Sequence, residues 1–209
     1  MNIYKLKNKF NVIKKAYEIS EEILKTSDEL NLVFTGGRFG EEFSKFIISK
    51  NFLIKNKNFY LTDERISKDI NQKNNILIFS KFKKTKNFEE NRFIDFEQSI
   101  KNFKNNFSLL KTIDLVFLSL GEDGHLAGHF PNSINLTKKI CYTHKDHLSN
   151  FERISFRIDF LVRAEKIVLA VIGKEKRNAL IDLLEGLNFH SKNILCNSKD
   201  ISIITDVNI

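Results

Sequence analysis

The best candidate for proton-transfer chemistry in the sequence is the segment Gly121-Glu122-Asp123-Gly124-His125. Histidine has an unperturbed pKa of about 6.5, so its imidazole can accept and release a proton near neutral pH. A carboxylate two residues before the histidine, with glycine between them, can bend back and orient the ring. We therefore predict His125 and Asp123 as catalytic residues, and a purely structural loop is the alternative.

Three other clusters of glycine or charged residues each follow an apolar run. They are Gly36-Gly37-Arg38, Asp63-Glu64-Arg65 and the segment from Gly173 to Lys176. Glycine backbone and helix N-termini bind anions, and Arg and Lys side chains add positive charge. Together with the histidine segment, these clusters indicate a small phosphorylated substrate. Taken singly, the glycine pair could be only a tight turn, and the second cluster could be a solvated ion pair.

Alternating strands and helices must position these clusters. The apolar runs that lead into them cover residues 30–34, 59–61, 113–120 and 167–172. Continuous apolar strands that alternate with helices imply an α/β fold, which we predict as a three-layer sandwich. Its sheet should be mostly parallel and Rossmann-like, with helices on both faces. The strand ends then share one edge, where ligands bind beside the point at which the strand order reverses.

The helices are predicted from apolar residues at three- and four-residue spacing. They cover residues 12 to about 28, 40–50, 93–107 and 176–187. Residues 201–205 supply a last strand, whereas residues 76–79 fit either type of element. No repeat or linker divides the chain, so we expect residues 1–209 to form a single domain.

The composition is typical of an ordinary folded protein, with 42% hydrophobic and 29% charged residues. The longest apolar runs fall far short of the roughly 18 residues that cross a bilayer, and the N-terminus lacks a signal-peptide pattern. We therefore expect a cytoplasmic protein without a membrane partner. Cys141 and Cys196 lie far apart in the sequence and are expected to be reduced thiols.

The net charge of +8 could attract nucleic acid, but codon supply in an AT-rich genome explains it more simply. The densest basic stretch, residues 81–86, has no recognition pattern beside it, so no nucleic-acid partner is predicted. His144 and His147 resemble a metal pair but lack a third ligand. His129 and His190 have no partners nearby in the sequence, so we predict no metal and no cofactor.

The histidine segment resembles a known family. From Asp114 to Ala127, with Phe130-Pro131 following, the chain is similar to the motif Asp-Leu-hydrophobic-Leu-Gly-Met-Gly-x-Asp-Gly-His-Thr-Ala-Ser-Leu-Phe-Pro. That motif marks the superfamily of 6-phosphogluconolactonases and glucosamine-6-phosphate deaminases. The other clusters occur in the family's order, with Asn75, Arg153 and Asp206 at further family positions, and the resemblance runs from about residue 10 to 206.

This resemblance implies hydrolysis of 6-phosphoglucono-1,5-lactone to 6-phosphogluconate, the second step of the oxidative pentose phosphate pathway. His125 would deprotonate the attacking water and then protonate the leaving ring oxygen, while Asp123 holds its tautomer. The other site residues would bind the sugar-phosphate lactone, which is the expected partner, and the oligomeric state stays open. Arg153, Lys176 and the amides of Gly36, Gly37 and Arg38 would hold the phosphate, and Arg65 beside Asp63 would steady the sugar or the developing oxyanion.

Two segments depart from the family pattern. The family's Gly-Gly-Ser-Thr-Pro is Gly36-Gly37-Arg38-Phe39-Gly40 here, which removes a hydroxyl and leaves Arg38 to bind the phosphate directly. The family's Ser-Leu after Ala is Gly128-His129, which changes the loop that follows the histidine.

Two rival functions come from different classes. The deaminase carries a Glu five residues after its His, and here that residue is Phe130, so the ring-opening apparatus is incomplete and the lactonase is favoured. A phosphosugar-binding regulator without catalysis is the other rival. Such a protein would have no need of the Asp123 and His125 pair.

Overall fold

A computed structural model describes most of the chain. The described residues are 1–26, 28–50, 56–82, 110–133, 140–143 and 151–209. The helix predicted over residues 93–107 lies outside them, as do His144 and His147. Among the described helices, none has the length and apolar character needed to cross a membrane.

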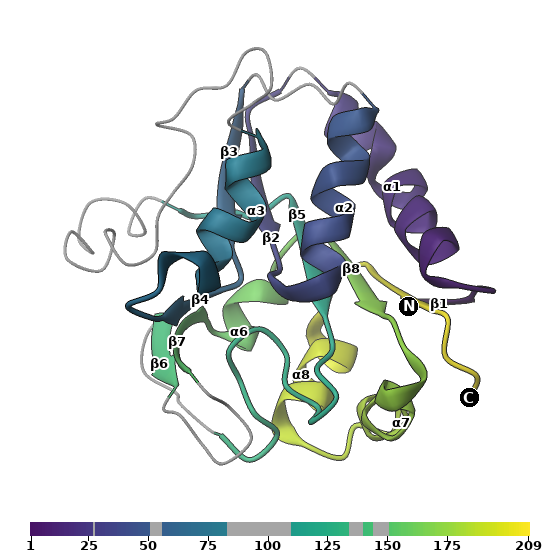
Figure 1. The fold of residues 1–209 in the computed structure, drawn as a ribbon. Helices are drawn as coiled ribbons and strands as arrows, with labels where there is room; N and C mark the ends of the chain where they lie inside the picture. Colours follow the sequence, from purple (N-terminus) through teal and green to yellow (C-terminus); the bar gives the residue numbers. More distant parts are fainter. Residues whose placement is uncertain (27, 51–55, 83–109, 134–139, 144–150) are drawn as a thin grey trace.

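Six parallel strands form the central sheet, in the order β1-β9-β8-β5-β2-β3. Figure 1 labels all of these strands except β9. Both faces of this sheet are covered, because successive residues of β8 from Ile167 to Val171 point to opposite faces and all are buried. The predicted α/β fold with a mostly parallel sheet is therefore confirmed. The strands are β1 (Asn2–Lys5), β2 (Leu30–Phe34), β3 (Lys57–Leu61), β5 (Leu115–Ser119), β8 (Lys166–Val171) and β9 (Ile201–Thr205).

Helices pack on the sheet in two groups. In the first group α2 contacts both α1 and α3, and in the second α8 contacts both α6 and α7. Aromatic side chains fill the core between α2 and the central strands, with the Phe43 ring 4.5 Å from that of Phe117 and 6.4 Å from that of Phe34. The helices are α1 (Lys9–Lys25), α2 (Gly37–Ser49), α3 (Asn74–Phe82), α6 (Ile158–Leu161), α7 (Arg177–Leu184) and α8 (Phe189–Asn197), with 3-10 turns η1 (Ile70–Gln72) and η3 (Lys174–Lys176).

A second, antiparallel sheet lies beside the first, and the sequence did not predict it. Its three strands, in the order β4-β7-β6, are β4 (Asp63–Ile66), β7 (Glu152–Phe156) and β6 (Ile140–Thr143). We expected Asp63 to Arg65 only as a charged cluster that follows the strand over residues 59–61, and this expectation is wrong. These residues form a strand of their own, in which Asp63 lies opposite Ser155 and Arg65 opposite Arg153.

Several boundaries differ from those expected from the sequence. Helix α2 begins at Gly37 rather than Gly40, and the undecided residues 76–79 belong to α3. The helix predicted over residues 176–187 ends at Leu184, and α8 follows after a turn at Gly186. Strand β1 was also missed, because it is an edge strand with mostly exposed residues and no apolar run.

Candidate active site

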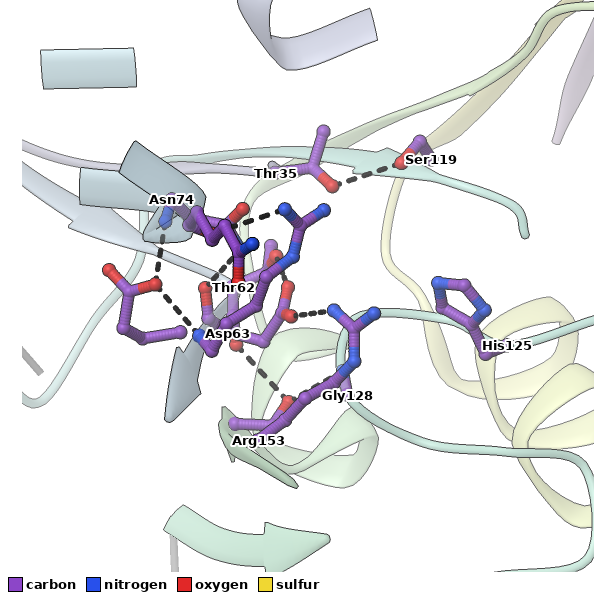
Figure 2. A network of polar contacts seen from close by, with 12 residues as sticks. Thr35, Thr62, Asp63, Asn74, Ser119, His125, Gly128 and Arg153 are labelled. Atoms are coloured by element: carbon purple, nitrogen blue, oxygen red, sulfur yellow. Dashed lines mark hydrogen bonds and ion pairs between the residues drawn. The ribbon is translucent and has the colours of Figure 1, made fainter. Parts of the chain in front are cut away.

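A pocket of about 180 Å³ opens at the carboxyl ends of the central strands. It lies where the strand order reverses, because β3 lies on one side of β2 while β5, β8 and β9 lie on the other. All of the predicted site residues except Asp123 line it: Gly36, Gly37, Arg38, Asp63, Arg65, His125, Arg153 and Lys176. Side chains that are far apart in the sequence therefore meet around one cavity, as Figure 2 shows for part of the set.

His125 is oriented by Asp123, which lies directly behind the pocket wall. The Asp123 Oδ1 lies 2.5 Å from the imidazole Nδ1 and also accepts the backbone N–H of His125 at 3.2 Å. Burial alone would raise the pKa of Asp123, but the hydrogen bond and charge of His125 outweigh it and hold that pKa below its usual value. An ionised carboxylate fixes the proton on Nδ1, so Nε2 is left as the nitrogen that can accept a proton.

Glycine is required at position 121 because the histidine ring packs against its backbone. A Cβ atom on Gly121 would lie 2.2 Å from Nδ1 of His125 and 2.5 Å from Oδ1 of Asp123. Any side chain here would displace the imidazole. The turn after β5 therefore carries His125 and also leaves, at Gly121, the space that the His125 ring occupies.

Arg153 and Asp63 form an ion pair across β4 and β7. The Arg153 Nη1 donates to Asp63 Oδ2 at 2.7 Å, and the two side chains are only 12% and 4% exposed. The second carboxylate oxygen, Oδ1, accepts the Thr62 hydroxyl at 2.9 Å. Both carboxylate oxygens of Asp63 therefore accept hydrogen bonds from the protein. This arrangement suits Asp63 to orient the Arg153 guanidinium (Figure 2).

Arg65 places a second guanidinium in the pocket wall. Its Nη1 donates to the Gln72 carbonyl at 3.1 Å, and the guanidinium lies 5.5 Å from the centroid of the Phe151 ring. Burial, and after it the neighbouring charge of Arg153, lowers the pKa of Arg65. Arg65 and Arg153 repel each other in the wall of one pocket. A bound anion would offset this repulsion, so the site favours an anion.

Lys176 supplies a cation from the turn after β8. Its Nζ donates to the Leu120 carbonyl at 2.5 Å, which fixes it beside the histidine segment. Burial lowers the pKa of the Lys176 ammonium, against the opposing charge of Glu175. The turn is held by Asp206, whose carboxylate accepts the Gly173 amide at 2.9 Å.

Arg38 lies at the rim of the pocket rather than inside it. Its side chain is 68% exposed and its Nη1 lies 3.5 Å from the Glu175 carboxylate. The neighbouring glycine turn opens α2, and the positive end of this helix lies at the cavity, because Gly36, Gly37 and Arg38 line it. Gly36 is pressed against α3, since a Cβ there would lie 2.3 Å from the Asn74 Oδ1.

Sequence reasoning missed three polar residues of the pocket wall, Thr35, Asn74 and Ser119. Thr35 and Ser119 share a hydrogen bond of 3.0 Å at the ends of β2 and β5. Thr35 directly follows β2, and Ser119 is the last residue of β5. Their position at the ends of apolar strands could therefore have identified both residues from the sequence. Asn74 gave no such signal, because it lies in a segment that reads as a polar loop.

His129 and His190 lie outside the pocket but contact each other. Their ring centroids are 4.9 Å apart, although they are far apart in the sequence. His129 Nε2 donates to the Phe156 carbonyl at 2.9 Å, and His190 Nε2 contacts the Ser133 carbonyl. In the part of the chain that the structure describes, no cluster of three or more metal-binding side chains accompanies them.

The sequence matches the family described as glucosamine-6-phosphate isomerases/6-phosphogluconolactonase over residues 10–194. The chain belongs to this family. The resemblance noted in the sequence is thereby confirmed, and family membership accounts for the order of the four clusters along the chain.

Curated relatives include both activities of the family. A glucosamine-6-phosphate deaminase from Staphylococcus haemolyticus is 26% identical over 54% of this chain, and the match spans about half, 52%, of that protein. A 6-phosphogluconolactonase from Borreliella burgdorferi is 29% identical over 71% of this chain and 70% of that protein.

Solved structures of the family share the fold along nearly the whole chain. A 6-phosphogluconolactonase from Thermotoga maritima matches with a TM-score of 0.78 at 21% identity, covering 99% of both chains. A monomeric glucosamine-6-phosphate deaminase matches with the same TM-score, 0.78, at 16% identity, covering 98% of this chain and 97% of that one. At these identities the likeness establishes the fold and does not choose between the two activities.

Proposed function

We propose that this chain hydrolyses 6-phosphoglucono-1,5-lactone to 6-phosphogluconate. The observation that carries the proposal is the convergence of one histidine–aspartate pair with Arg65, Arg153 and Lys176 around a single pocket. A phosphorylated lactone needs both parts, since its phosphate binds to cations while its carbonyl must be attacked by water.

The reaction proceeds in two proton transfers at one nitrogen. His125 Nε2 accepts a proton from water as the water oxygen bonds to the lactone carbonyl carbon. The bond between that carbon and the ring oxygen then breaks, and the same nitrogen returns its proton to the leaving ring oxygen. Asp123 stabilises the intervening imidazolium through the Nδ1 contact.

The cations have separate tasks in this proposal. Arg153, Lys176 and the amides of Gly36 to Arg38 bind the phosphate, and Arg65 steadies the sugar or the oxyanion that forms at the carbonyl. Asp63 acts through Arg153, because its two oxygens are already engaged by Arg153 and Thr62. We place the reaction in the cytoplasm, because a charged phosphate ester does not cross a lipid bilayer unaided.

Deamination of glucosamine 6-phosphate is the second candidate, since two of the curated relatives carry the name glucosamine-6-phosphate deaminase. The residue five positions after His125 weighs against it. That residue is Phe130, whose ring centroid lies 5.6 Å from the imidazole, so a phenyl ring rather than a carboxylate faces His125 there.

The decisive experiment offers the purified chain both substrates and follows each above its spontaneous background. We expect the lactone to be consumed and glucosamine 6-phosphate to be left intact, and His125→Ala to lose lactone turnover while keeping its fold. Ser49→Ala, an exposed site at the end of α2, serves as the control. Wild-type lactone turnover in His125→Ala would refute the assigned proton carrier, and turnover of glucosamine 6-phosphate alone would refute the proposed function.

A further inference from the structure

Glu64 is a buried carboxylate for which the proposed reaction has no use. It is 1% exposed, and burial raises its pKa to about 7 against the opposing effect of its backbone hydrogen bonds. Its neighbours Asp63 and Arg65 both line the pocket, whereas Glu64 does not. Alternation along β4 explains this, because successive side chains of a strand project to opposite faces.

The carboxylate of Glu64 binds the start of α3. Its Oε1 accepts the backbone N–H of Asn74 at 2.6 Å and that of Arg65 at 2.7 Å. Its Oε2 accepts the N–H of Asn75 at 2.8 Å. The first amides of a helix lack partners within the helix, and a negative charge there is favourable, so Glu64 caps α3 from a strand of the second sheet.

The capped end of α3 forms one wall of the pocket. Asn74 donates its side-chain amide to the Asp63 carbonyl at 2.9 Å and packs against Gly36. Arg65 is held at its backbone N–H by the same carboxylate that holds Asn74. The Glu64 side chain, which lies outside the pocket, therefore contacts Arg65 and Asn74 of the pocket wall directly and reaches the glycine turn through Asn74.

We infer that Glu64 is a positioning residue of the active site, which sets Arg65 and, through Asn74, the glycine turn at Gly36 for the bound sugar phosphate. This inference rests on the proposed function for its substrate. Misplacing a substrate-positioning group by about 1 Å can cost on the order of a hundredfold in rate. Glu64→Gln keeps the shape of the side chain but turns an NH2 group toward a backbone N–H.

The test measures kcat/KM for the lactone in Glu64→Gln and Glu64→Ala, with the thermal midpoint of each. We expect kcat/KM to fall about tenfold in the first variant and about a hundredfold in the second. Val12→Ala, at a fully buried position in α1 that does not line the pocket, loses stability without touching this network and should keep wild-type kcat/KM.

Each result decides the inference. Wild-type kcat/KM in Glu64→Gln with a lowered thermal midpoint would show that Glu64 only stabilises the fold, and the inference would be wrong. If Glu64→Ala does not fold, Glu64→Gln carries the test.

If wild-type protein does not hydrolyse the lactone, the proposed function fails, and calorimetric binding of 6-phosphogluconate replaces turnover. An affinity that falls about tenfold in Glu64→Gln then supports positioning, and an unchanged affinity overturns it.

Discussion

Acid should destabilise this fold through His129, a buried histidine four residues after His125. The residue is 2% exposed, and burial, with the added repulsion of His190, lowers its pKa from 6.5 to about 4. The unfolded chain therefore binds a proton at higher pH than the folded chain does. The stability contributed by neutral His129 is fully present above pH 6.5 and is lost as the pH falls toward 4.

The size of the effect follows from these two values. Between pH 8 and pH 5, proton linkage with pKa values of 6.5 and about 4 removes on the order of 2 kcal/mol from the free energy of unfolding. His129→Gln can still donate a hydrogen bond to the Phe156 carbonyl but does not titrate. The variant should thus lose about 2 kcal/mol less than wild type over the same range of pH.

Urea unfolding at pH 8 and pH 5, followed by circular dichroism, measures this difference. Glu165→Gln, which alters a carboxylate that is 58% exposed, is the control and should keep the wild-type pH dependence. The reasoning is wrong if wild type and His129→Gln lose the same free energy of unfolding between the two pH values, since His129 would then carry the proton equally in both states.

Three further substitutions test how the site is held together. Asp63→Ala removes the carboxylate that pairs with Arg153, whose side chain is only 12% exposed, so it should cost on the order of 3 kcal/mol in urea unfolding and raise KM for the lactone; an unchanged KM would mean that Asp63 does not position Arg153 for the substrate. Gly121→Ala should displace the imidazole of His125 and lower kcat about a hundredfold with little change in thermal midpoint, and a normal kcat would contradict the packing described above. Arg38→Ala should change the free energy of unfolding by at most about 1 kcal/mol, because its ion pair with Glu175 is exposed. If Arg38 binds the phosphate, the same variant should raise KM for the lactone several-fold. Equal KM values in the variant and wild type would show that Arg38 does not bind the substrate.

The central sheet and its ligand-binding edge were predictable because their signals are local. Strands buried on both faces must be continuous apolar runs, and the run from Ile167 to Val171 is one. The residues just after such strands lie at one edge of the sheet by topology alone, which is why His125 and Lys176 could be placed in one pocket from the sequence.

The second sheet was not predictable, because its pairing joins distant and weakly patterned segments. Asp63 and Arg153 are 90 residues apart, and β7 reads Glu-Arg-Ile-Ser-Phe, which mixes charged and apolar residues without a long apolar run. The capping of α3 by Glu64 was not predictable for the same reason. A side chain of one element satisfies the amides of another, so neither segment shows the interaction when it is considered alone.

Strand β7 gives the second sheet a role in setting the geometry of the reaction. It supplies Arg153, and it also holds the loop after His125, because Ser155 Oγ accepts a hydrogen bond from the Gly128 amide at 3.0 Å and the Phe156 carbonyl accepts one from His129 Nε2 at 2.9 Å. The proposed phosphate anchor, Arg153, and the loop that follows the proposed proton carrier, His125, are therefore both held by one strand. The phosphate is joined to the lactone ring by single bonds that rotate, so a site that holds its anchor and its catalytic loop on one strand can select the conformer in which the carbonyl lies beside His125.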